Sequence, residues 1–253
     1  MDKRDRYIAV FDSGVGGISV LKELVALMPQ ENYLYFGDSA NAPYGDRPTS
    51  QVRQLTMAAA EMLLERGIKA LVVACNTATA AAIRDLREAY PDTIIVGIEP
   101  ALKLAYDRYG AGRVGVMATQ VTLREEKFSH QLERFPDMQV SLIPAPGLVE
   151  LIEAGKADAP ETEALLRQLL GPYVGRLDAL VLGCTHYPFV KTTIAHILGE
   201  TTQLLDGSQG TARHTMRRLA EAGLLREGEG SLQIENSAND PKLLALAAHL
   251  LEK

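Results

Sequence analysis

A nine-residue pattern occurs twice in the chain, first as Lys69-Ala70-Leu71-Val72-Val73-Ala74-Cys75-Asn76-Thr77 and again as Asp178-Ala179-Leu180-Val181-Leu182-Gly183-Cys184-Thr185-His186. Each copy is an aliphatic run that ends at a cysteine and continues into polar residues, which is typical of a buried strand and the loop at its carboxyl end. A fainter echo pairs residues 8–13 with residues 114–119 at a similar separation. The two repeats predict two similar halves, each built on a sheet.

Short strand-like runs alternate with longer segments of helical periodicity along the rest of the chain. This alternation predicts βαβ units and mostly parallel sheets, so the expected fold class is α/β. The expected strands are residues 7–11, 33–36, 68–74, 93–98, 113–118, 139–143, 178–182 and 203–205, and helices are expected over residues 18–28, 51–66 and 121–134. We expect residues 1–98 and 207–253 to form one domain and residues 99–206 the other.

Composition narrows the class of protein. The chain has 253 residues, 47% hydrophobic and 23% charged, which excludes a disordered protein. A net charge of −6 with scattered basic residues argues against a nucleic-acid partner. The longest uncharged stretch of the Ala/Val-rich middle, residues 70–83, is too short to span a membrane, and the charged residues 1–6 do not form a signal sequence. We therefore expect a cytoplasmic protein with a small-molecule partner.

Two cysteines are too few for a disulfide framework or a structural zinc site, so no metal is expected. Cys75 and Cys184 each stand between a strand and a predicted helix N-terminus, whose dipole lowers a thiol pKa. Two thiols that face one cleft suit proton exchange at a single carbon, because inversion needs a base on one face and an acid on the other. The pair predicts reversible racemisation. The alternative is two packed core residues, the commonest fate of free cysteine.

Two further loops follow predicted strands. Asp12-Ser13-Gly14-Val15-Gly16-Gly17 offers glycines for a tight turn and N–H groups for a carboxylate or phosphate, with Asp12 directed into the cleft. Its spacing is neither a dinucleotide fingerprint nor a Walker A loop, and a glycine turn that packs a strand on a helix is the alternative. In residues 37–45, Tyr44 and Gly45 offer a hydroxyl and an N–H to a carboxylate, or form a plain turn. His186 is placed to tune Cys184 or relay its proton.

Together these segments resemble the glutamate racemases, in the superfamily of cofactor-independent aspartate/glutamate racemases. Four motifs in the family's order carry the resemblance: residues 11–17, 37–45, 74–78 and 182–188. It implies two similar α/β domains related by pseudo-twofold symmetry, with the active site in the cleft between them. It also implies that there is no cofactor and that the protein is a homodimer.

The resemblance further implies interconversion of L- and D-glutamate, with D-glutamate supplied for peptidoglycan. Cys75 and Cys184 would be the acid/base thiols, with Asp12 and His186 beside them. The implied substrate-binding residues are Asp12, Ser13, Tyr44, Gly45, Asn76, Thr77, Thr185 and His186. Asp38 and Glu153 lie where the family often carries acidic residues. Ala145-Pro146 stands where many members have a Cys-Pro pair, and the mechanism does not need that third cysteine.

Three questions stay open at this point. The chain fits a racemase of aspartate or another amino acid, because one methylene changes binding by only about 1 to 3 kcal/mol. It also fits a non-catalytic binding protein whose thiols sense redox state. The short N-terminus predicts no activation by a cell-wall precursor, and the acidic composition does not support the gyrase inhibition described for some members.

Overall fold

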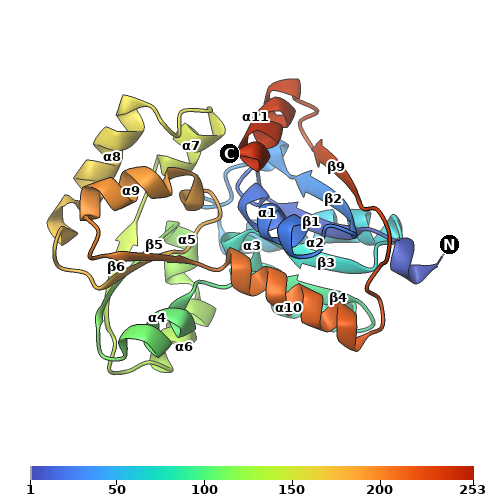
Figure 1. Ribbon diagram of the computed structural model, residues 1–253, viewed down its shortest axis with the longest axis horizontal. Coiled ribbons are helices and arrows are strands. Elements are labelled where there is room, and N and C mark those ends of the chain that lie inside the picture. The colour runs from blue at the N-terminus through green and yellow to red at the C-terminus, as the bar shows by residue number, and fades with distance from the viewer. Residues whose placement is uncertain (1) are drawn as a thin grey trace.

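The structure, a computed structural model, describes residues 2–253, with the side chain at position 127 left aside. Met1, with which the first predicted domain begins, lies outside the described residues. The described residues form two parallel sheets (Figure 1). The first has the order β4 (Ile94–Gly97), β3 (Ala70–Val73), β1 (Ile8–Asp12), β2 (Asn32–Gly37) and β9 (Ser231–Asn236). The second has the order β6 (Gln139–Pro144), β5 (Arg113–Ala118), β7 (Ala179–Leu182) and β8 (Gln203–Asp206).

The two sheets repeat one topology. The order β4-β3-β1-β2 in the first sheet matches β8-β7-β5-β6 in the second, so β3 corresponds to β7 and β1 to β5. These are the two pairs of strands in which the sequence repeats. The predicted α/β class with two similar, mostly parallel sheets is therefore confirmed, and both cysteines follow the equivalent strand of their sheets.

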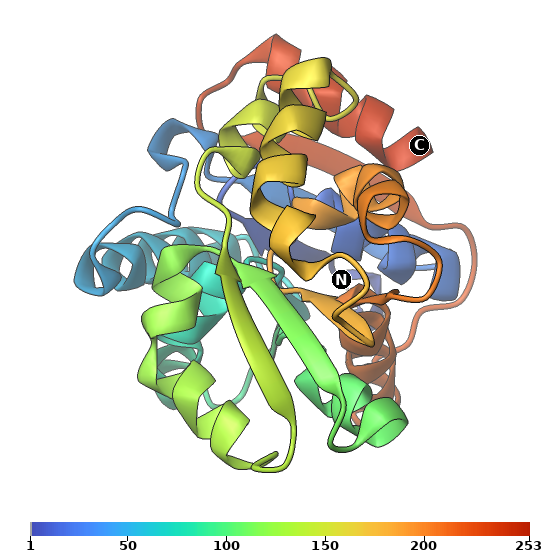
Figure 2. The same ribbon diagram turned by 90° about the vertical axis from the view of Figure 1, so that its left-hand side faces the viewer.

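Helices cover both faces of each sheet (Figures 1 and 2). Alternate residues of a strand point to opposite faces, so Ile8 and Val10 pack under one helical layer and Ala9 and Phe11 under the other. The layers on the first sheet are α1 (Ile18–Leu27), α10 (Ser208–Glu221) and α11 (Pro241–Glu252) on one face, and α2 (Thr49–Glu65) and α3 (Asn76–Ala89) on the other. On the second sheet, one face is covered by α7 (Leu148–Glu153), α8 (Pro160–Leu170) and α9 (Lys191–Leu198). The other face is covered by α4 (Leu102–Tyr109) and α6 (Glu126–Glu133), with α5 (Gln120–Arg124) beside them.

Two elements differ from the sequence-based prediction. Strand β9 was not predicted, because its mixed residues Ser231-Leu-Gln-Ile-Glu-Asn form a half-exposed edge strand beside β2. The helix expected over residues 121–134 is interrupted at Glu125, whose backbone is extended and caps α6. Within residues 2–253, no helix combines the length and apolar character needed to cross a membrane.

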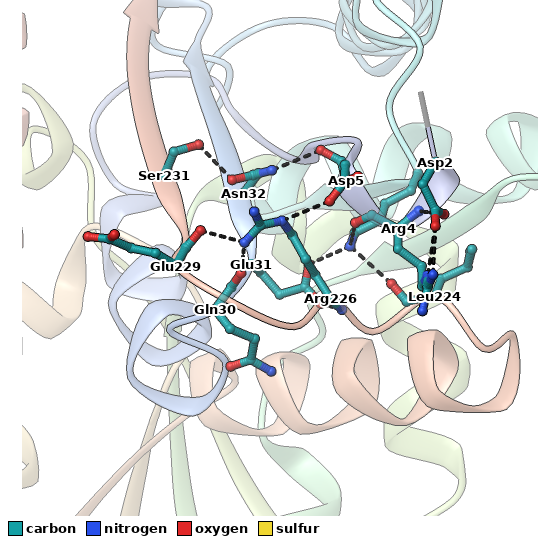
Figure 3. A network of polar contacts seen from close by, with 11 residues as sticks. Asp2, Arg4, Asp5, Gln30, Glu31, Asn32, Leu224, Arg226, Glu229 and Ser231 are labelled. Atoms are coloured by element: carbon teal, nitrogen blue, oxygen red, sulfur yellow. Dashed lines mark hydrogen bonds and ion pairs between the residues drawn. The ribbon is translucent and has the colours of Figure 1, made fainter.

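A buried ion pair lies near the amino ends of the strands of the first sheet, within the network of polar contacts that Figure 3 shows. Lys69 and Glu31 pair with side chains that are 1% and 0% exposed. The Lys69 ammonium also donates to the carbonyls of Arg4 at 2.6 Å and Leu224 at 3.0 Å, and Glu31 accepts from the Arg226 N–H at 2.9 Å. The pair therefore connects four parts of the chain: the segment before β1, the amino ends of β2 and β3, and the segment that leads to β9.

Candidate active site

Cys75 follows β3 after one intervening residue, Ala74, and caps α3. Its Sγ accepts from the Ala78 N–H at 3.4 Å and lies 3.5 Å from the Ser13 hydroxyl oxygen. Burial, followed by the charge of Asp12, raises the pKa of Cys75 to about 12, although the bonds from Ser13 and Ala78 lower it. The expected lowering by the helix N-terminus is therefore wrong for this thiol, because desolvation of a buried thiolate outweighs two hydrogen bonds. Cys75 rests as a protonated thiol.

Asp12 ends β1 and is fully buried. Its Oδ1 accepts from the Gly14 N–H at 2.8 Å, and its Oδ2 accepts from the Thr185 hydroxyl at 2.9 Å. Burial raises the pKa of Asp12, while the charge of His186 and these two bonds oppose the rise. Thr185 belongs to the loop after β7, so Asp12 links the carboxyl ends of the two sheets directly.

Cys184 belongs to a chain of three ionisable groups. Its Sγ lies 3.7 Å from Nδ1 of His186, and Nε2 of His186 lies 2.6 Å from Oε1 of Glu153. Burial alone would lower the pKa of His186, but its bonds to Cys184 and Glu153 raise it well above the ordinary value of 6.5. Burial would likewise raise the pKa of Glu153, and the ion pair with His186 lowers it. The site therefore holds an imidazolium between the Cys184 sulfur and the Glu153 carboxylate.

The glycine-rich loop after β1 makes room for this chain of groups. A Cβ on Gly14 would lie 1.9 Å from Oε1 of Glu153, and one on Gly16 would lie 2.4 Å from Nδ1 of His186. The Val15 N–H donates to Oε1 of Glu153 at 2.8 Å. The Val15 N–H, in the loop expected to bind a ligand anion, therefore binds the carboxylate of Glu153 instead. Glycine is required at positions 14 and 16 because the side chains of Glu153 and His186, from the second half, approach the backbone there.

The loop of residues 37–45 follows β2 and packs beside the site, with Tyr44 in the same core cluster as Cys75. The Tyr44 hydroxyl donates to Oδ2 of Asp38 at 2.7 Å, and Oδ1 of Asp38 accepts from Ser237 at 2.7 Å. The hydroxyl is thus engaged within the loop. A Cβ on Gly45 would lie 2.9 Å from Thr119, so this loop also packs on the second half.

Two threonines that the sequence analysis missed join the site. The Thr77 hydroxyl oxygen lies 3.0 Å from that of Thr119 and 3.3 Å from that of Thr122. The faint repeat contained the signal for one of them, because it aligns Thr119 after β5 with Ser13 after β1. Beside them, the buried Oδ1 of Asn76 has no hydrogen-bond partner in the described part of the chain, as a group awaiting a ligand would.

The predicted site residues thus meet where the carboxyl ends of the two sheets face each other. Ser13 contacts Cys75, and the neighbouring Asp12 accepts from Thr185, which follows Cys184, so the two thiols share one site. Each thiol has an ionisable neighbour, Asp12 for Cys75 and His186 for Cys184. Over the residues that the structure describes, no group of three or more His, Cys, Asp or Glu side chains could hold a metal ion.

Comparison with known proteins agrees with this geometry. Residues 14–215 match the Asp/Glu/Hydantoin racemase family. Glutamate racemases of Clostridium perfringens and Clostridium kluyveri are each 48% identical to the chain; the first alignment covers 99% of this chain and 98% of its relative, the second 100% of both.

Solved structures are similar over the same length. The glutamate racemase of Thermus thermophilus in complex with β-chloro-D-alanine is 39% identical, with a TM-score of 0.84 over 99% of this chain and 94% of that one. The Francisella tularensis enzyme in complex with D-glutamate is 28% identical, with a TM-score of 0.87 over 99% and 95%. The chain is therefore an amino-acid racemase and belongs to the Asp/Glu/hydantoin racemase family.

Proposed function

We propose that the chain interconverts L-glutamate and D-glutamate by a two-base mechanism, needs no cofactor, and supplies D-glutamate for peptidoglycan. The observation that carries the proposal is the placement of Cys75 and Cys184. They follow equivalent strands of two sheets whose carboxyl ends are joined by the hydrogen bond from Thr185 to Asp12, and each has an ionisable partner. The relatives named glutamate racemase support the substrate. A cytoplasmic location and a homodimer are further parts of the proposal, and light scattering of the purified protein tests the homodimer.

In this mechanism one cysteine acts as thiolate and the other as thiol. The thiolate takes the Cα proton from one face of glutamate, and the thiol gives its proton to the opposite face. One C–H bond and one S–H bond break, and one of each forms, so the number of each kind of bond is unchanged. Burial keeps Cys75 protonated, and His186, whose ring Nδ1 lies 3.7 Å from the Cys184 sulfur, is the ionisable partner of the second thiol. The reverse reaction begins from the opposite protonation states.

Glutamate needs strong stabilisation as charge develops on its α-carboxylate, because its Cα–H is a very weak acid. Buried hydrogen-bond donors fixed before the reaction supply such stabilisation with little reorganisation. We propose that the following groups bind the substrate: Asp12, Ser13, Asn76, Thr77, Thr119, Thr122, Thr185 and His186, with the backbone N–H groups of Tyr44 and Gly45. Asp38 orients Tyr44, and Glu153 orients His186.

Substrate entry requires the two halves to separate. Asp12, Cys75, Cys184 and His186 are between 0% and 7% exposed, so glutamate does not reach them in this arrangement. We propose that residues 1–98 with 207–253, and residues 99–206, move apart as two domains about the crossings near residues 98 and 206. Closure then excludes water and completes the set of donors around the substrate.

Circular dichroism of amino-acid solutions tests the proposed function. We expect the purified protein, under reducing conditions and without added cofactor, to abolish the optical signal of L-glutamate and leave that of L-aspartate unchanged. The protein with both cysteines replaced by alanine is the control and should change neither signal. Loss of the aspartate signal would replace the substrate, and loss of neither would favour the non-catalytic binding protein.

Replacement of Glu153 by glutamine should shift the pH dependence of the reaction. The amide keeps the shape of the side chain but removes the charge that holds the pKa of His186 high. We expect the alkaline limb of kcat/KM to move to lower pH by about 1 to 2 units, the size of the shift that one close opposite charge produces. The matched control is Glu163→Gln, which removes an exposed carboxylate paired with Arg167. An alkaline limb that stays in place would contradict the role of the ion pair.

The same pair gives a stability prediction with a defined sign. The raised pKa of His186 stabilises the fold below about pH 6.5, the reference value for an unfolded histidine, and this contribution is lost as pH rises through the folded pKa. The lowered pKa of Glu153 stabilises the fold above about pH 4.3 and is lost as pH falls through its folded pKa. Glu153→Gln should therefore cost most stability between these two values, as urea unfolding at several pH values will show.

A further inference from the structure

Ser19, in the first turn of α1, has a buried hydroxyl that reaches the second half of the molecule. Its Oγ donates to the carbonyl of Thr185 at 2.9 Å and also lies 2.9 Å from the carbonyl of Gly16. The Gly16 carbonyl already accepts from the Ser19 N–H at 3.0 Å. Because a hydroxyl has a single proton, the Thr185 carbonyl is the acceptor that depends on it.

The turn after Cys184 has a gap in its own series of hydrogen bonds. It leads into the short 3₁₀ helix Tyr187–Val190, in which an N–H donates to the carbonyl three residues earlier. The Tyr187 N–H accordingly donates to the Cys184 carbonyl at 3.2 Å. The Phe189 N–H donates to the His186 carbonyl at 3.1 Å. The bond that should stand between these two, to the carbonyl of residue 185, is missing.

The sequence explains the gap. The regular donor to the Thr185 carbonyl would be the N–H of residue 188, but that residue is Pro188, which has no N–H. Thr185 is 3% exposed, and a buried carbonyl without a donor destabilises the conformation that strands it. The Ser19 hydroxyl supplies the donor that Pro188 cannot. The shape of this turn therefore depends on a contact between the two halves.

The peptide that Ser19 holds lies between two groups of the site. The Thr185 carbonyl belongs to the planar unit that joins Thr185 to His186, so its orientation fixes where the His186 backbone begins. The His186 ring in turn lies 3.7 Å from the Cys184 sulfur. The Thr185 side chain donates to Asp12 at 2.9 Å, so the first half holds this residue at both its hydroxyl and its carbonyl.

We propose that Ser19 is a positioning residue for the Cys184 thiol and the His186 ring; this inference rests on the proposed two-base function. It acts through the Thr185 peptide and not on the reacting atoms. Donor and acceptor belong to different halves, so the turn gains its donor only when the halves are closed. Closure then aligns the second thiol at the same time as it excludes water.

Ser19→Ala removes the hydroxyl and should lower kcat for glutamate about tenfold, because a misplacement of about 1 Å costs up to about 10²-fold. KM should change less than kcat, and Ser19→Thr, which keeps a hydroxyl, should retain most of the activity. The matched control is Thr215→Val. It removes a buried hydroxyl that donates to the Thr211 carbonyl at 2.9 Å within α10, and it should leave kcat unchanged.

Pro188→Ala provides a sharper test, because it gives residue 188 an N–H that can donate to the Thr185 carbonyl. In a protein that already carries Pro188→Ala, adding Ser19→Ala should lower kcat less than about twofold, since the two donors replace each other and the substitutions are coupled. An equal loss with and without Pro188→Ala would show that Ser19 does not act through this carbonyl. An unchanged kcat in Ser19→Ala would equally overturn the proposal.

Hydrogen exchange in deuterium oxide locates the effect at one thiol. In Cys75→Ala only the Cys184 thiol remains, and in Cys184→Ala only the Cys75 thiol. Adding Ser19→Ala should slow exchange of the Cα proton of glutamate about tenfold more in the first protein than in the second. Equal slowing in both would indicate a general loss of structure and overturn the positioning role. Failure of the unsubstituted protein to racemise glutamate would instead overturn the proposed function.

Discussion

Replacement of either Cys75 or Cys184 by alanine will abolish net racemisation of glutamate, while the remaining thiol still exchanges the Cα proton of one enantiomer. Racemisation needs a base on one face of the planar intermediate and an acid on the other. A single thiol can remove a proton and return one to the same face, which exchanges hydrogen without inversion. We expect turnover to fall by about 10²-fold to 10⁴-fold or more, the contribution of a positioned proton-transfer group.

Two measurements on the same samples check this result. Circular dichroism follows racemisation, and proton NMR in deuterium oxide follows loss of the Cα proton from L- or D-glutamate. Cys75→Ala and Cys184→Ala should exchange opposite enantiomers, and the double variant should exchange neither. Wild-type turnover in either single variant would contradict the assignment. Exchange of the same enantiomer by both variants would show that the thiols do not flank the substrate from opposite faces.

The two thiols are equivalent in topology but differ in environment. Both follow corresponding strands, yet Cys75 lies beside a buried carboxylate, Asp12, and Cys184 beside a histidine whose pKa is raised. A negative neighbour favours the thiol form and a positive neighbour favours the thiolate form. The surroundings of the two thiols therefore differ, and the enantiomer that Cys75 deprotonates should react only after Cys75 has lost its proton.

Much of the fold could be predicted because strands buried on both faces have a clear sequence pattern. The aliphatic runs before Cys75 and Cys184 locate β3 and β7, and their similarity predicts the repeated sheet. Strand β9 could not be predicted, since a half-exposed edge strand has no such run. The interruption of the predicted helix at Glu125 could not be predicted either, because the helical spacing of hydrophobic residues continues through this position. Only the extended backbone of Glu125 separates α5 from α6.

For the site, sequence motifs located the residues but not the contacts between them. The contact of Glu153 with His186, and of its Oε1 with Val15, joins segments far apart in the chain and depends on how the sheets face each other. The helix N-terminus predicted a lowered pKa for Cys75, and only the structure shows that burial reverses the shift. Local pattern reports which groups are present, whereas the pKa depends on the depth at which they are buried.

Replacement of Lys69 by methionine will destabilise the fold by about 3 to 5 kcal/mol, because it leaves Glu31 buried without its partner. The carbonyls of Arg4 and Leu224 also lose a donor, and methionine provides none. Urea unfolding at neutral pH measures the change. The turnover of the folded variant should stay close to that of the unsubstituted protein, because Lys69 lies at the amino end of β3 and Cys75 follows its carboxyl end.

Two further variants separate the ion pair from simple loss of a lysine. Lys103→Met breaks an exposed pair with Asp107 and should cost less than about 1 kcal/mol, since surface pairs are screened by water. Adding Glu31→Leu to Lys69→Met removes the stranded carboxylate and should recover part of the loss, because an apolar pair avoids the desolvation cost. Recovery remains partial, since the Arg226 N–H then loses its acceptor. If Lys69→Met cost no more than Lys103→Met, the buried pair would not be what holds the β9 segment to the first sheet.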